Sequence, residues 1–170
     1  DATIDLTGAL LDGNNITLNA TSTLDIDTDG FSISSVTFAV IYAQSDADVI
    51  LHNTTIAADG NLSISAASNV AARASLKSDA STSSSFDAAI AVSYIDSAAR
   101  AYVSGTSHVT VGGEVTLSAR NDVTSYAMAD GSTTGTAGAA LALNIVKNET
   151  RAYIAGTASI DDSTNANEAD

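Results

Sequence analysis

The chain contains no cysteine, no proline and no tryptophan among its 170 residues. Without cysteine it forms no disulfide and no thiolate metal site, although this alone assigns no cellular compartment. Proline removes a hydrogen bond from a central strand, so its absence is typical of a chain that is mostly strand. Aromatic residues make up only 5%, and much of the 45% hydrophobic content is alanine. Such small side chains favour an interior of regular, closely spaced layers over a conventional globular core.

Basic residues are also scarce, since six Lys and Arg stand against twenty Asp and Glu and give a formal net charge of −14. Nucleic acids and anionic membranes are therefore poor partners, because both are negatively charged. No apolar run has the length of a bilayer span, so we expect no membrane insertion. The chain begins with Asp1 and shows no signal peptide, and we interpret it as a mature piece or an excised fragment.

One motif occurs twice, as RAYVSGT at residues 100–106 and as RAYIAGT at residues 151–157. A shift of 51 residues (151 − 100) aligns the longer segments 89–109 and 140–160 without a gap. Weaker copies of an apolar-x-apolar-x-Ala frame, each after a glycine-bearing turn, occupy residues 16–24, 62–70 and 115–123. The chain therefore holds about three and a half imperfect repeats of a unit near fifty residues, a length typical of stacked units.

Within the repeats the hydrophobic residues alternate with period two, which predicts strands rather than helices. In 114–120, Val115, Leu117 and Ala119 point to one side of the expected strand. In the same way, the large hydrophobic residues at positions 36, 38, 40 and 42 share one face of the strand expected at 36–43. The alanine-rich segment 68–80 is the strongest helical alternative, and we predict that it is strand because of its serine and asparagine content.

A repeat of this length built from short strands is compatible with a sandwich, a propeller or a solenoid. Three and a half copies are too few for a propeller, which needs at least about four blades. A solenoid needs no closure, because each coil buries its face on the next. We therefore predict an all-β, parallel β-solenoid with about two coils of roughly 25 residues per repeat. It should span residues 1–160 as a single unit, with 115–119 stacked over 62–66 either directly or one coil removed, and residues 161–170 should form an acidic, frayed tail.

The repeats are similar to those of giant filamentous haemagglutinin-like and leukotoxin-like bacterial surface adhesins. The resemblance is carried by ALALNIVKNETRAYI (140–154), AIAVSYIDSAARAYV (89–103) and GEVTLSA (113–119), and it covers roughly residues 36–160. It implies a right-handed parallel β-helix, secretion to the bacterial cell surface and a role in cell adhesion or as a stalk. It supplies no catalytic residues, and the first copy departs from it, with SDADVIL at 45–51 in place of the Arg-Ala-Tyr segment.

We therefore expect a structural or adhesive module of a large secreted adhesin, and not an enzyme. The expected partners are a host or cell-surface receptor or glycan, neighbouring solenoid repeats, and further copies of the chain joined end to end. The alternative is a carbohydrate-binding or carbohydrate-cleaving β-helix, which needs a groove with converging acids, arginine and sugar-stacking aromatics. We interpret the recurring tyrosines as architectural, and we expect Arg100 and Arg151 two coils apart on one face.

The segment DIDTDG at 25–30 raises a calcium hypothesis. Asp25, Asp27, Asp29 and Gly30 match the start of an EF-hand loop, but Val36 stands where the bidentate glutamate belongs. Alternation along a strand explains the same aspartates as its solvent-exposed side. Calcium at Asp25, Asp27 and Asp29 is the one cofactor hypothesis that the sequence offers, since the two histidines lack the paired spacing of a zinc site.

Overall fold

The structure is a computed structural model that describes residues 1–33, 36–77, 86–131 and 137–162. Within these ranges all regular elements are strands, and the described part of the chain has no helix of the length and apolarity that a membrane crossing requires. The strands are β1 (Ala2–Thr7), β2 (Leu10–Gly13), β3 (Ile16–Thr28), β4 (Phe31–Ile33), β5 (Val36–His52), β6 (Thr55–Ala58), β7 (Leu62–Lys77), β8 (Phe86–Ser104), β9 (His108–Val111), β10 (Val115–Asp130), β11 (Ala137–Ile154) and β12 (Ser159–Asp162).

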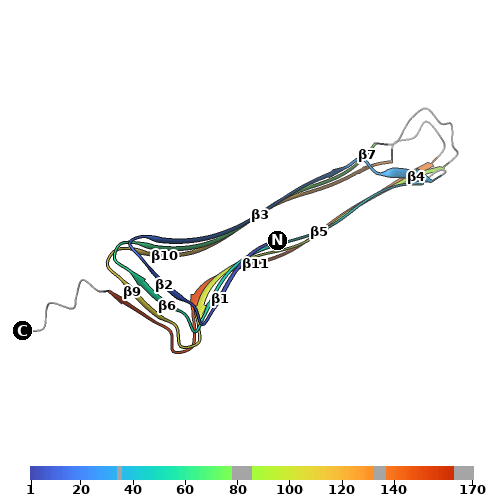
Figure 1. Cartoon of the computed structure of the whole chain (residues 1–170). Helices are drawn as coiled ribbons and strands as arrows, with labels where there is room; N and C mark the ends of the chain where they lie inside the picture. Colours follow the sequence, from blue (N-terminus) through green and yellow to red (C-terminus); the bar gives the residue numbers. More distant parts are fainter. Residues whose placement is uncertain (34–35, 78–85, 132–136, 163–170) are drawn as a thin grey trace, which may run out of the picture.

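The strands form three parallel sheets that the chain visits in turn (Figure 1). The β5 sheet has the order β1-β5-β8-β11, the short sheet has the order β12-β9-β6-β2, and the β7 sheet has the order β10-β7-β3. Strand β4 adds an antiparallel pair to β5. The two long sheets lie face to face, and the short sheet joins them at one end, which has a triangular outline in Figure 1; we call the opposite end, near β4, the distal end. The predicted all-β parallel solenoid is confirmed.

The register shows that one repeat makes one coil, so the prediction of two coils per repeat was wrong. Arg151 pairs with Arg100 at an offset of 51 residues, and Ala88 pairs with Val36 at an offset of 52 (88 − 36). The main strands run for 13 to 19 residues, far longer than two coils per repeat would allow. The polar residues Ser45 and Ser97, which look like turn residues in the sequence, lie inside β5 and β8 and are buried.

Other details of the predicted layout are confirmed. Residues 115–119 stack directly on 62–66 in the register of β10 and β7. The alanine-rich segment belongs to β7 as far as Lys77, and its last residues lie outside the described part of the chain. At the C-terminal end, β12 continues to Asp162, two residues past the expected boundary, and the rest of the predicted tail lies outside the described residues.

The buried hydrophobic side chains form two clusters along the length of the coils. One fills the triangular end, where Leu51, Ile56 and Leu62 converge from three sheets. The other lies between the two long sheets and contains Ile41 and Leu76 among many alanines. Both clusters continue from coil to coil, because like residues stack in register.

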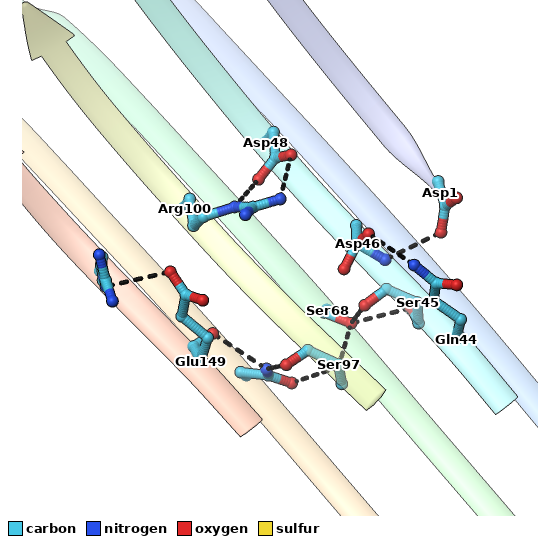
Figure 2. Close-up of polar contacts among 11 residues, drawn as sticks. Asp1, Gln44, Ser45, Asp46, Asp48, Ser68, Ser97, Arg100 and Glu149 are labelled. Atoms are coloured by element: carbon cyan, nitrogen blue, oxygen red, sulfur yellow. Dashed lines mark hydrogen bonds and ion pairs between the residues drawn. The ribbon is translucent and has the colours of Figure 1, made fainter. Parts of the chain in front are cut away.

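A row of hydroxyl groups, which we call the serine ladder, crosses the interior between the two clusters (Figure 2). It alternates between the long sheets, with Oγ–Oγ distances of 2.8 Å for Ser22–Ser45, 2.9 Å for Ser45–Ser68 and 3.0 Å for Ser68–Ser97. Ser97 then donates to Asn121 Oδ1 at 2.8 Å. Small side chains here let the sheets approach each other, and each hydroxyl finds a partner in the opposite sheet. Among the described residues no buried side-chain polar atom lacks a hydrogen bond.

The corner after each strand of the β5 sheet has a residue with a left-handed backbone. Its φ is 63° at Gly8, 51° at Asn53, 71° at Gly105 and 77° at Gly156. This conformation is accessible to glycine and, less readily, to asparagine. The repeated Gly-Thr pair of the sequence is thus a corner, as its recurrence predicts.

We expect Gly105→Ala to destabilise the fold more than Gly8→Ala. Both changes place a Cβ in the left-handed region, which costs about 1–2 kcal/mol. At Gly105 the Cβ would also press on Asn53 Oδ1 and approach His52 Cε1 to 2.9 Å, whereas at Gly8 it meets open space. Urea unfolding of both variants measures the difference, and equal losses would contradict the crowding at the Gly105 corner.

Candidate functional site

The three predicted calcium ligands lie on solvent-exposed positions at the distal end of β3. Asp25 and Asp27 alternate with the inward-facing Leu24 and Ile26, and Asp29 follows the strand. Asp29 Oδ1 accepts a hydrogen bond from Ser75 Oγ at 3.5 Å. Nowhere in the described ranges do three or more His, Cys, Asp or Glu side chains form a group that could hold a metal ion. This placement agrees with the alternative interpretation, in which the aspartates are the solvent-exposed side of a strand. Calcium binding stays a prediction.

Beside these aspartates, outward-facing side chains from three strands form what we call the Arg73 block. Register partners on β3, β7 and β10 make its first row, and the next outward positions make its second. The members are Asp27, Arg73 and Tyr126 in the first row and Ser75 and Met128 in the second, together with Asp29, which follows β3 and accepts a hydrogen bond from Ser75. The block therefore exists only because three coils are in register.

Arg73 differs in its partners from the other arginine and lysine side chains that the structure describes. Its guanidinium carbon lies 5.7 Å from the centroid of the Tyr126 ring, within cation–π range. The other arginine and lysine side chains that the structure describes all form ion pairs, namely Arg100, Arg120, Lys147 and Arg151. Within the described residues the guanidinium of Arg73 has no ion pair and no hydrogen bond, although Asp27 is its neighbour on β3.

A hollow of about 380 Å³ opens at this block, lined by Asp29, Arg73, Ser75 and Met128. Tyr126, at its side, is 47% exposed, and its hydroxyl donates to Met128 Sδ at 3.1 Å. The lining thus offers guanidinium donors, a carboxylate acceptor, a hydroxyl and a thioether, and the Tyr126 ring lies beside it, under Arg73. Groups of this kind hydrogen-bond a polar ligand and pack against its apolar side.

On the outer face of the β5 sheet, the half near the triangular end is charged. Arg100 makes two hydrogen bonds of 2.8 Å to the carboxylate of Asp48 in the neighbouring coil (Figure 2). That interaction raises the pKa of Arg100 above its usual range, against a smaller opposing effect of burial. Arg151 lies directly beside Arg100, one coil away, and pairs instead with Glu149 at 3.0 Å. The prediction that the two arginines lie two coils apart was wrong, because one repeat is one coil.

The recurring tyrosines stack between coils, as the interpretation of them as architectural predicts. The rings of Tyr42 and Tyr94 lie 5.4 Å apart, and those of Tyr102 and Tyr153 lie 5.1 Å apart, both nearly parallel. Burial raises the pKa of Tyr102. Around the first stack the distal half of this outer face is apolar and exposed, with Val40, Tyr42, Leu141, Leu143 and Ile145 all at least 41% accessible.

The two histidines do not form a proton relay. His108 Nδ1 lies 2.9 Å from Ser159 Oγ and 3.5 Å from Asp161 Oδ2. A Ser-His-Asp relay needs the serine and the aspartate on opposite ring nitrogens, whereas here both lie on the same one. His52 Nδ1 contacts only the hydroxyl of Ser104 among described side chains, at 3.1 Å.

Sequence reasoning missed the pairing of Arg73 with Tyr126, although a signal for it exists. The shift of 53 residues that aligns 62–70 with 115–123 also places Arg73 opposite Tyr126 (126 − 73) when it is extended along the strands.

Comparison with known proteins adds nothing to this assignment, since no family model, no curated protein and no solved structure matches the chain. The function must be inferred from the geometry of this chain.

Proposed function

We propose that the chain is a structural and adhesive β-solenoid module of a large secreted protein of the bacterial surface, of the adhesin kind that its repeats resemble. Its role is to add rigid length to a stalk, without enzymatic activity of its own. The observation that supports this role is that the two ends of the stack are open and chemically alike. Neighbouring coils are therefore its natural partners.

The likeness of the ends is clearest in the β7 sheet. At one edge β10 carries Val115 and Leu117 facing inward, and at the other edge β3 carries Ile16 and Leu18 in the same columns. All four side chains are only partly buried, although they pack against the core cluster of the triangular end. A further coil of the same chemistry would cover each pair and would also satisfy the unpaired backbone groups of the edge strands.

Stacking of this kind lets a stalk grow longer while its core keeps the same structure. Each coil contacts mainly its neighbours, so added coils extend the core without changing its pattern, and each adds about 4.8 Å of length. The same edges should join separate copies end to end. Because β11 and β12 already occupy the fourth position of their sheets, the second copy would place its β1 on β11 and its β2 on β12, with Thr3 beside Arg151 in the column of Arg100.

A pair of cysteines tests this arrangement in a chain that has none of its own. In Thr3→Cys/Arg151→Cys the two cysteines of one molecule lie three strand spacings apart, about 14.4 Å, which is too far for a disulfide. Between stacked copies they become adjacent. We expect mild oxidation to give a ladder of covalent oligomers on a non-reducing gel.

The matched control is Thr3→Cys/Glu149→Cys, in which the second cysteine is moved two residues along the same face of β11. In stacked copies its Cα would lie about 8 Å from the Cα of position 3, beyond disulfide reach. A ladder of equal strength in both variants would indicate random collision. The absence of a ladder in both would show that the open ends do not take a second copy.

A second candidate function, carbohydrate binding, is favoured by one specific observation, the hollow beside Arg73. It would make the module adhesive by itself rather than only a spacer. We expect binding without cleavage, because glycoside hydrolysis needs two carboxyl groups on either side of the scissile bond. The two aspartates of the block, Asp27 on β3 and Asp29 just after it, instead follow one another along one chain segment.

A further inference from the structure

We infer that the hollow of the Arg73 block is a subsite for one ring of a neutral saccharide. This inference rests on the second candidate function, glycan binding, and is independent of the stalk role. It assigns the hydrogen-bonding groups to Arg73, Asp29 and Ser75, and the apolar contact to Met128 and Tyr126. Three features of the block support it: an unpaired cation, a complementary acceptor, and the charge of the surrounding face.

The first feature is the state of the guanidinium. In a chain of net charge −14 an exposed arginine normally finds a carboxylate, and the other arginines described here do so. Arg73 lies over the Tyr126 ring instead. A stacked guanidinium is held in a fixed orientation, while its N–H groups stay free to donate to a ligand.

The second feature is the acceptor on the opposite side of the hollow. Asp29 makes one long hydrogen bond, 3.5 Å from Ser75, so its carboxylate keeps most of its capacity to accept. Neighbouring hydroxyls of a sugar both accept from an arginine and donate to a carboxylate, and such charge-assisted bonds are the stronger ones. The carbon-bound hydrogens of the ring would pack on Met128 in the lining and on Tyr126, which lies beside the hollow and is 47% exposed.

The third feature is the charge of the face, which selects among ligands. Asp25, Asp27 and Asp122 lie exposed on the same face of the β7 sheet as Asp29. An acidic sugar beside Arg73 would meet Asp27 in the same row and Asp25 two residues along β3, both within the screening length of about 8 Å that applies at physiological salt. A cationic ligand would be repelled by Arg73 itself. A neutral sugar uses the donor and the acceptors together and opposes neither charge.

The size of the hollow agrees with a single ring. Its volume of about 380 Å³ is at the lower end of the range for small-molecule sites, which begins near 300 Å³. It is formed on an open sheet face and not in a deep cleft, so weak binding is expected, of the kind that repeated modules strengthen by multivalency. A stalk that repeats this block would present such subsites in a row.

The test is a titration of the whole chain, labelled with ¹⁵N, followed by NMR. Maltotriose, cellotriose and mannotriose are the neutral probes, and trigalacturonate is the anionic probe. We expect at least one neutral trisaccharide to shift the resonances of Arg73 and Tyr126, and trigalacturonate to shift neither. Arg73→Ala and Tyr126→Ala should each weaken that binding at least tenfold, with Arg73→Lys in between because lysine lacks the planar fork.

Arg120→Ala is the matched control, since Arg120 lies exposed on the same face and pairs with Asp122 at 2.6 Å. It should leave saccharide binding unchanged, and unfolding curves should show all four variants folded. The inference is overturned if no neutral trisaccharide shifts the block, if Arg73→Ala and Arg120→Ala bind alike, or if trigalacturonate binds more tightly. None of these results affects the cysteine test of end-to-end stacking, so the two proposals fail separately.

Discussion

Ala72→Arg should prevent folding, whereas Ala71→Arg, one residue earlier on β7, should leave stability within about 0.5 kcal/mol of the wild type. Ala72 is 2% exposed and lies in the cluster between the two long sheets. An arginine there would bury an unpaired charge and overfill a layer of small side chains, at a cost of several kcal/mol. Ala71 is exposed and is the register partner of Asp25, so its new charge stays in water near an acid.

Circular dichroism and thermal unfolding of the two purified variants would measure this contrast. The pair is matched in residue type, strand and substitution, and differs only in the face of the sheet. If both variants unfold at the wild-type temperature, or if the order is reversed, the alternation of inward and outward residues on β7 is wrong. That alternation supports every assignment made to the Arg73 block.

The second large effect is expected at the centre of the serine ladder. Ser68 is fully buried, and its hydroxyl lies 2.9 Å from Ser45 Oγ and 3.0 Å from Ser97 Oγ. Ser68→Val removes both hydrogen bonds, costing about 1–3 kcal/mol, and adds volume between closely packed sheets, costing about 1–3 kcal/mol more. Ser63→Val, on the outward face of the same strand, should have little effect because valine is well tolerated in strands.

Urea unfolding gives the free energies, and Ser68→Ala separates the two contributions because it removes the hydroxyl without adding volume. The double variant Ser45→Ala/Ser68→Ala should cost less than the sum of its single changes, since the two residues share a hydrogen bond. Strict additivity would mean that the ladder does not act as a connected network. A stable Ser68→Val protein would mean that the sheets have room to separate.

Much of this architecture can be predicted from the sequence, because both the alternation within a strand and the spacing between repeats are visible in it. Alternation gives the inward and outward faces, and the 51-residue shift gives the register that places Tyr153 on Tyr102 and Gly156 near Gly105. The width of the coil could not be obtained in this way. A serine such as Ser45 has the same local signal in a turn as in a buried ladder, and only its partners in the opposite sheet decide between them.

The candidate site is also only partly predictable from the sequence. Register alone brings Arg73 beside both Asp27 and Tyr126. The choice of the ring over the carboxylate depends on side-chain conformation, which no sequence pattern encodes. The hollow depends in turn on that choice, because the guanidinium forms part of its lining.

The serine ladder also has a direction. Ser97 donates its only hydroxyl hydrogen to Asn121 Oδ1, so it can only accept from Ser68. When Ser68 donates along the shorter contact, 3.0 Å to Ser97, and not to the backbone oxygen of Ser45 at 3.3 Å, Ser68 accepts from Ser45 and Ser45 accepts from Ser22, so that all four O–H vectors follow one sense from the first coil to the third. The amide of Asn121, itself oriented by donating to the backbone oxygen of Ser97, therefore sets the rotor state of a hydroxyl four hydrogen bonds away. Exchange of this single amide for an apolar side chain would release the whole row of rotors to reverse together.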